Sequence, residues 1–251
     1  MKTYDHTDSM KPMTERTAQE SQTLISFWDK AFAMSVEGQK QVLEGDVEDW
    51  KELAPSEKLF KAACALGQRK KVLDYGCGNA WASIIAAKSG CVDVTAVDAA
   101  PGAVQVARFY AMRYGVSGCV NSECVSSDWL QGIPAGAYDG LICSNVLDVV
   151  PPETAETIIQ ELGRVTARDG IVVIGLNYYL APEVASTKGL ELVDGNRLYV
   201  DGVLRLVSRT DGEWAGIFSP WYSVEKLEHF AWPGETKETR RLFWLRKRGD
   251  A

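Results

Sequence analysis

Residues 71–79 read K-V-L-D-Y-G-C-G-N, and this stretch decides the fold of the chain. A short apolar run ends in an acidic residue, two glycines follow one residue apart, and the helix-forming Ala80-Trp81-Ala82 comes next. This order predicts a strand, a tight turn and the start of a helix. Glycine lets the backbone turn sharply or approach a ligand closely, and the first N–H groups of a helix are free to bind one. We therefore predict a ligand-binding turn at Gly76 and Gly78.

A second acidic residue makes the predicted ligand more specific. Asp98 ends the next strand-like run, Val92 to Val97, at about the distance where a ribose-binding carboxylate is expected. The third glycine of a dinucleotide fingerprint would fall at position 81, which is occupied by Trp81. The pattern thus indicates a ligand that carries a ribose, with an incomplete pyrophosphate signature. A helix-capping role for Asp98, just ahead of Pro101, stays open.

Strand and helix patterns alternate after this turn. Strand-like runs at 92–97, 119–125, 138–144 and 171–176 are separated by segments whose apolar residues recur at helical spacing. The alternation predicts an α/β fold with a doubly wound, Rossmann-like, mostly parallel seven-stranded sheet and helices on both faces. The basic run Arg240 to Arg248 is predicted to hold the last strand, at an edge of the sheet where its charges prevent pairing with other chains.

The chain divides into four predicted segments. Residues 1–20 are expected to be a flexible tail and residues 21–68 an N-terminal helical cap. Residues 69–179 and 223–248 are expected to form the cofactor-binding core, with Ser223 to Phe230 as a helix. Residues 180–222 are expected to be a β-rich insertion, because Asp194-Gly195, Asp201-Gly202 and Asp211-Gly212 are typical hairpin turns. This insertion is predicted to roof the acceptor pocket together with the N-terminal helices, and the alternative is that its aromatic residues pack into its own small core or a dimer contact.

Composition excludes several classes of function. The 251-residue chain has a net charge of −7, which argues against a nucleic-acid partner because such binding needs a positive surface. No apolar run approaches the roughly 20 residues of a membrane span, so we expect a cytoplasmic protein with no membrane partner. The six cysteines are never spaced C-x-x-C and the only histidines are His6 and His229. We therefore predict reduced thiols and no metal site.

These motifs resemble those of the class I S-adenosylmethionine-dependent methyltransferases, in their small-molecule branch. Val72 to Asn79 is similar to the first motif of that family, and Asp98 matches the acid that ends its second strand. The resemblance covers most of residues 56–179. It implies S-adenosyl-L-methionine as the cofactor and S-adenosyl-L-homocysteine as the product.

The resemblance also implies where the cofactor binds. The predicted cofactor residues are Asp74, Tyr75, Gly76, Cys77, Gly78, Asn79, Asp98, Ala99, Asp128, Trp129, Ser144 and Asn145. Asp98 would accept hydrogen bonds from both ribose hydroxyls, Asp128 would accept one from the adenine amino group, and Trp129 would offer a flat apolar contact. A solvent-facing turn is the alternative for Asp128 and Trp129. Ser144 and Asn145 would lie at the methionine end. Since N-terminal helices commonly fold over the cofactor in this family, Trp28 or Trp50 is a candidate lid residue, with a place in the hydrophobic core as the alternative.

The sequence says less about the residues that bind the methyl acceptor. Asn145 is followed by Val146, whereas base methyltransferases of nucleic acids carry two prolines and an aromatic residue there, so the resemblance implies a small-molecule acceptor. Asp148 is the nearest carboxylate to the end of the fourth strand and is predicted to assist the acceptor, either by orienting it or by taking its proton as a general base. Several small-molecule relatives have a histidine at the corresponding place. A homodimer, an NAD(P)-dependent oxidoreductase and a noncatalytic cofactor-binding or scaffolding protein remain open alternatives.

Overall fold

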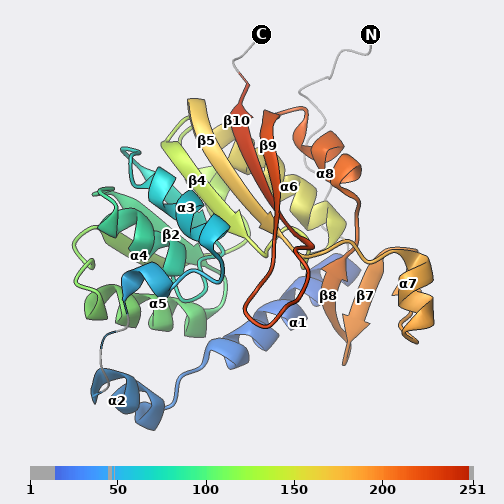
Figure 1. The fold of residues 1–251 in the computed structure, drawn as a ribbon, viewed down its shortest axis with the longest axis horizontal. Helices are drawn as coiled ribbons and strands as arrows, with labels where there is room; N and C mark the ends of the chain where they lie inside the picture. Colours follow the sequence, from blue (N-terminus) through green and yellow to red (C-terminus); the bar gives the residue numbers. More distant parts are fainter. Residues whose placement is uncertain (1–14, 45–46, 48, 249–251) are drawn as a thin grey trace.

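The computed structural model describes residues 15–44, 47 and 49–248, and a seven-stranded sheet forms its centre. The strand order is β3-β2-β1-β4-β5-β10-β9. Strand β10 runs antiparallel to both of its neighbours, while the strands from β3 to β5 pair in parallel. The prediction of a doubly wound, mostly parallel sheet is confirmed (Figure 1).

Helices cover both faces of this sheet. Its strands are β1 (Val72–Tyr75), β2 (Val94–Asp98), β3 (Val120–Cys124), β4 (Tyr138–Ser144), β5 (Thr166–Leu176), β9 (Tyr222–Phe230) and β10 (Arg240–Lys247). One face packs on α3 (Glu57–Leu66), α4 (Trp81–Lys88) and α5 (Pro101–Arg113). The other packs on α6 (Pro152–Val165), α8 (Asp211–Phe218) and the short 3-10 helix η2 (Trp129–Gly132). The two hydrophobic layers hold the carboxyl ends of β1, β2 and β4 at one edge, where ligands bind in open α/β sheets.

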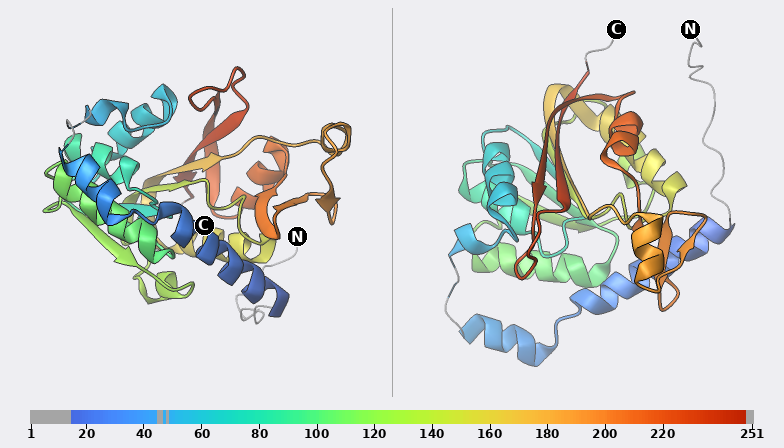
Figure 2. Two further views of the ribbon diagram at one scale, coloured as in Figure 1. Left: turned by 90° about the horizontal axis from the view of Figure 1, so that it is seen from below. Right: turned by 45° about the vertical axis from the view of Figure 1, so that its right-hand side comes forward.

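The N-terminal helix crosses this ligand-binding edge. Helix α1 (Glu15–Phe32) is followed by α2 (Val36–Glu44) and the 3-10 helix η1 (Trp50–Glu52). Figure 2 shows α1 running past the carboxyl ends of the strands toward the insertion. Of the predicted tail, residues 1–14 lie outside the described residues, but Glu15 to Glu20 form the first turns of α1. That part of the prediction is wrong because Glu20 has a distant partner, the hydroxyl of Tyr199 at 2.9 Å.

The insertion mixes strands with helices. It contains α7 (Pro182–Thr187) and a three-stranded antiparallel sheet of β6 (Leu192–Val193), β7 (Arg197–Val200) and β8 (Val203–Val207), and it ends with α8. Two predicted hairpin turns are confirmed by positive φ angles at Asp194-Gly195 and Asp201-Gly202. The third is wrong: Asp211-Gly212 opens α8, because Thr210 and Glu213 form a capping box ahead of it.

The C-terminal hairpin corrects two more expectations. Residues 223–230, predicted as a helix, belong to strand β9, because β9 pairs along its whole length with β10. Strand β10 lies between β5 and β9, so β9 is the edge strand and β10 is interior. The arginines at the start of β10 are buried and paired: the guanidinium of Arg241 is 1% exposed and donates to the carbonyl of Asn177 at 2.7 Å.

The described residues also bear on the compositional expectations. All six cysteines are free thiols. Across residues 15–44, 47 and 49–248, no cluster of three metal-ligating side chains occurs, and no helix combines the length and apolarity of a membrane span.

Candidate functional site

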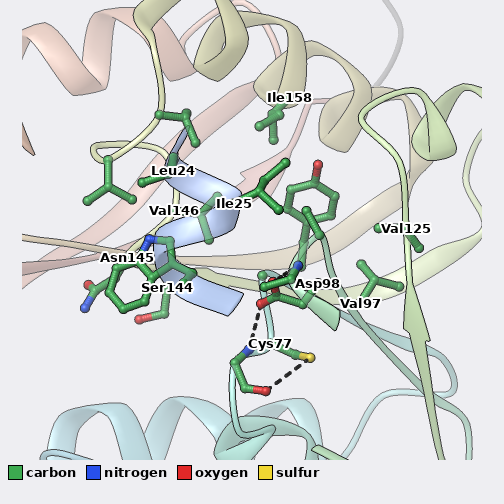
Figure 3. A pocket seen from close by; sticks show the side chains of 18 of the residues that line it. Leu24, Ile25, Cys77, Val97, Asp98, Val125, Ser144, Asn145, Val146 and Ile158 are labelled. Atoms are coloured by element: carbon green, nitrogen blue, oxygen red, sulfur yellow. Dashed lines mark hydrogen bonds between the residues drawn. The ribbon is translucent and has the colours of Figure 1, made fainter. Parts of the chain in front are cut away.

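A cavity of about 350 Å³ lies at the carboxyl ends of β1, β2 and β4. Nine of the predicted cofactor residues line it: Tyr75, Gly76, Cys77, Gly78, Asn79, Asp98, Ala99, Ser144 and Asn145. Figure 3 shows Asp98, Ser144 and Asn145 gathered around the turn that carries Cys77. The structure therefore brings together the ends of three strands that are well separated in the sequence.

The glycine turn has the geometry that its sequence predicted. The amides of Gly76 and Cys77 both donate to the carbonyl of Val97, at 2.8 and 2.9 Å, which fastens the turn to β2. Gly76 has a φ of +75°, and a Cβ there would stand 2.2 Å from the Cγ2 atom of Val146. Position 76 thus requires glycine for both its conformation and its surroundings. Gly76 therefore lines the cavity with its backbone, packed closely against Val146.

Asp98 is held by backbone amides with its carboxylate at the cavity. Its Oδ2 accepts from the amide of Gly78 at 3.0 Å, and its Oδ1 accepts from the amide of Ala100 at 2.9 Å. Each carboxylate oxygen can accept a further hydrogen bond, so Asp98 can serve the turn and a ligand together. Burial raises the pKa of Asp98, opposed by these two amides. Asp98 therefore caps the neighbouring backbone amides, and its carboxylate can still bind a ribose.

Asp74 fastens β1 to α4 and does not line the cavity. Its Oδ2 accepts from the amide and the hydroxyl of Ser83, at 3.2 and 2.6 Å, and its side chain is 4% exposed. Its predicted contact with the cofactor is therefore indirect, because it positions the helix that begins beside the turn. Burial raises the pKa of Asp74 from 3.8 to about 6.

This raised pKa predicts a pH dependence of stability. Because the folded-state pKa lies above the unfolded one, the stability contributed by Asp74 is fully present below pH 3.8 and is lost as the pH rises to about 6. At about 1.4 kcal/mol for each pH unit, the loss amounts to about 3 kcal/mol. Asp74→Asn should remove this part of the decline in unfolding free energy between about pH 4 and 7, measured by urea denaturation. Identical pH profiles for both proteins would contradict the assignment.

The end of β4 supplies the opposite wall of the cavity. Asn145 adopts a φ of +57°, and its amide donates to the carbonyl of Gly175 at 2.8 Å. Asparagine tolerates this left-handed conformation better than most residues. The bend turns the chain from β4 along the cavity, so Val146, Val149 and Val150 follow Asn145 in the lining.

Asp128 and Trp129 lie outside the cavity lining. Asp128 is exposed and its side chain accepts from the hydroxyl of Ser126, while Trp129 packs partly buried against the hydrophobic layer beneath α6. The residues that reach the cavity after β3 are Val125, Ser126 and Ser127. Asp128 and Trp129 turn away from the cavity because the chain enters η2 at Trp129, so their predicted contacts with adenine stay untested.

Asp148 also lies away from the cavity. Its side chain is 0% exposed, and its Oδ2 accepts from the amide of Asn177 at 2.5 Å. Its own carbonyl accepts from the amide of Val207 at 2.6 Å, so Asp148 joins the β4–α6 loop to the ends of β5 and β8. Burial raises the pKa of Asp148, and the positive charge of Arg241 opposes this rise. This arrangement gives the predicted general base no route to an acceptor.

Asp148→Asn is therefore expected to change stability rather than chemistry. The amide removes the negative charge that attracts the guanidinium of buried Arg241, and the loss of a charge from such a buried environment costs about 3–5 kcal/mol at most. We expect a lower melting temperature and, below it, a kcat within about threefold of the original protein. A large fall in kcat at unchanged cofactor affinity would restore Asp148 as the base.

Several lining residues were not predicted as site residues. Helix α1 contributes Ser21, Leu24, Ile25 and Phe32 along with the candidate lid residue Trp28, whereas Trp50 packs on Phe60 in the core. Thr154, Thr157 and Ile158 come from α6, and Trp232 comes from the loop between β9 and β10. The apolar run after Asn145 was the available signal for the β4 side. Nothing local marks Trp232, which is far from the other lining residues in sequence.

The insertion contributes no residue to the cavity lining. The prediction that residues 180–222 roof the acceptor pocket is wrong in this respect, because α1 lies between the insertion and the cavity. Tyr199 contacts α1, while Trp214 and Phe218 are fully buried in the hydrophobic layer under the sheet.

Comparisons with known proteins agree with this site. Residues 72–170 match the family described as the methyltransferase domain. A ubiquinone biosynthesis O-methyltransferase from Xanthomonas axonopodis pv. citri (strain 306) is 32% identical over 121 residues, which cover 43% of this chain and 49% of that protein. The chain thus matches about half the length of that curated relative.

Two solved structures share the fold over most of the chain. The 1,6-didemethyltoxoflavin-N1-methyltransferase of Burkholderia thailandensis, with 1,6-didemethyltoxoflavin and S-adenosylhomocysteine bound, superposes with a TM-score of 0.65 at 18% identity, covering 95% of this chain and 93% of that one. The magnesium protoporphyrin IX methyltransferase of Synechocystis PCC 6803, with S-adenosylhomocysteine bound, gives 0.62 at 17% identity, covering 91% and 99%.

The sheet order, the glycine turn, the acid at the end of β2 and the matched residues define a class of protein. This chain carries a class I S-adenosylmethionine-dependent methyltransferase domain, whose matched part runs from β1 into β5. The family match decides against the nicotinamide-dependent alternative.

Proposed function

We propose that this protein transfers a methyl group from S-adenosylmethionine to a small-molecule acceptor. The observation that carries the proposal is the character of the cavity. One end has the glycine turn and Asp98, and the rest is lined mainly by apolar side chains of α1, the β4–α6 segment and Trp232. Such a cavity suits a cofactor beside a small, largely apolar molecule.

The residues of the turn fit the cofactor. A carboxylate oriented by two amides suits a ribose diol, and the glycine turn lines the cavity beside it. Asp98 would hold the ribose, with Ser144 and Asn145 at the methionine end. When bound, S-adenosylmethionine supplies an activated methyl group for an in-line displacement, in which orientation and exclusion of water contribute much of the acceleration.

The residues that line the cavity also indicate the protonation state in which the acceptor must bind. Among the described residues that line the cavity, Asp98 is the only one with a charged side chain, and in this proposal it holds the ribose. Cys77 lines the cavity as a neutral thiol, because burial raises its pKa well above the usual value. In the described part of the lining, no charged side chain is therefore left to take a proton, and the acceptor atom would carry its own free lone pair at neutral pH.

Methyl transfer tests this proposal directly. The protein would be incubated with S-adenosylmethionine tritiated in its methyl group and with fractionated metabolites from cell extract. Label should appear in a small molecule and should be absent with Asp98→Ala. Tight binding of S-adenosylhomocysteine with no label transferred to any fraction would support the noncatalytic alternative instead.

A further inference from the structure

Helix α1 is held against the cavity by the insertion. The hydroxyl of Tyr199 on β7 donates to Glu20 at 2.9 Å. Arg197, also on β7, stands 4.0 Å from Glu20 and 3.4 Å from Glu153 of α6. Figures 1 and 2 show the three-stranded sheet beside the first half of α1. The insertion therefore joins α1 to the helix that forms the other side of the cavity.

Arg205 of β8 lies against two aromatic residues of α1, one of which lines the cavity. Its guanidinium lies 4.3 Å from the ring centroid of Phe27 and 5.7 Å from that of Trp28. The two rings meet edge to face, with centroids 5.2 Å apart. Trp28 lines the cavity, whereas Phe27 and Arg205 do not. Cation–π contacts of this kind orient an aromatic ring as well as attract it.

The second half of α1 contacts α5 and the glycine turn. The Oδ1 atom of Asp29 accepts from the amide of Gly102, in the first turn of α5, at 2.6 Å. The ring of Phe32 lies over the glycine turn, 3.0 Å from where a Cβ of Gly78 would stand. Between Glu20 and Asp29, Leu24 and Ile25 reach the cavity (Figure 3). Helix α1 thus covers a site whose cofactor contacts come from the sheet.

We propose that Arg205 is a positioning residue, which holds Phe27 and Trp28 so that α1 stays closed over the bound cofactor. The insertion would thus act on the reaction through α1 without touching either substrate. This inference rests on the proposed function, because it requires that the cavity bind S-adenosylmethionine and its product. When the contact is lost, α1 should open more often and the ligand should leave faster.

The test uses S-adenosylhomocysteine as the probe. For Arg205→Ala we expect about tenfold weaker binding by calorimetry, equal to about 1.4 kcal/mol, mostly from faster dissociation in stopped-flow fluorescence. Arg205→Lys keeps a cation near the rings and should bind within about threefold of the original protein. The change in tryptophan emission on binding should be smaller in Arg205→Ala than in the original protein. The part of the change that comes from Trp28 is identified as the part lost in Trp28→Phe, and this part should be absent in Arg205→Ala.

A matched control separates positioning from general stability. Arg209 also packs on an aromatic ring, that of Trp214 at 5.1 Å, and pairs with Glu156 at 3.9 Å, and both partners lie outside α1. Arg209→Ala should lower the melting temperature and leave affinity for S-adenosylhomocysteine unchanged. If Arg205→Ala does not fold, Phe27→Leu removes the closer arginine contact without altering a lining side chain, and it should loosen binding to a similar extent.

The outcomes are distinct. Unchanged affinity and dissociation rate in folded Arg205→Ala or Phe27→Leu would overturn the proposal and leave Arg205 a structural residue. If Arg209→Ala weakens binding of S-adenosylhomocysteine equally, the proposal is also overturned, because the weaker binding would then result from lower stability of the protein. Failure of the original protein to bind S-adenosylhomocysteine would instead refute the proposed function itself.

Discussion

Asp98→Ala is expected to abolish tight binding of S-adenosylhomocysteine while leaving the protein folded. Two ribose hydroxyls would lose a charged acceptor, and hydrogen bonds to charged groups contribute about 1.5–3 kcal/mol each, so the affinity should fall at least about tenfold. The amides of Gly78 and Ala100 would lose their acceptor as well, which should loosen the turn and add to the loss. Isothermal calorimetry measures the affinity, and circular dichroism checks the fold.

Asp139 offers a matched control for this change. Its carboxylate also accepts from two backbone amides, those of Lys70 at 3.1 Å and Lys71 at 2.8 Å, but it does so ahead of β1, at the end away from the cavity. Asp139→Ala should reduce stability by a similar amount and leave the affinity for S-adenosylhomocysteine unchanged. If Asp98→Ala binds as tightly as the Asp139 variant, Asp98 serves only to cap the turn.

Replacing Leu180 to Tyr222 by a short Gly/Ser linker is expected to prevent folding. The sequence alone suggested that this segment is separable and that cofactor binding would survive its loss. In the structure Trp214 and Phe218 are 0% exposed and Tyr222 is 2% exposed, all within the hydrophobic layer beneath the sheet. Truncating one such aromatic residue costs about 3–5 kcal/mol, so the loss of all three, about 9–15 kcal/mol, is as large as the whole stability of a typical domain.

Single substitutions make this expectation measurable. Trp214→Ala should lower the unfolding free energy by about 3–5 kcal/mol in urea denaturation. Val200→Ala, in the same segment but 47% exposed, should change it by less than about 0.5 kcal/mol. A linker variant that folds and binds S-adenosylhomocysteine would show that α8 is dispensable to the core.

Local chemistry accounts for what could be predicted. A strand, a Gly-x-Gly turn and a helix are encoded within residues 71–88, and the alternation that follows predicts a parallel sheet. The carboxyl ends of such strands meet at one edge, so Asp98, Ser144 and Asn145 could be placed together before any coordinates were known.

Distant pairing accounts for the errors. Residues 223–230 contain helix-compatible glutamates and a lysine, but β10 supplies a complete row of backbone partners and makes them a strand. Asp148 looked available because it follows β4, yet its carboxylate meets the amide of Asn177 in the core. In each case a partner many residues away decided the conformation, and no local pattern records that partner.

By itself, the sequence determined the class of domain, the glycine turn and the acid that faces it, because these depend on residues a few positions apart and on the hydrophobic periodicity of the chain. Only the tertiary structure decided what closes the cavity. Helix α1, the β4–α6 segment and Trp232 converge there from three parts of the chain, and Arg205 reaches α1 from a fourth. Such contacts form because folding buries these faces together, which depends on the whole set of packed elements.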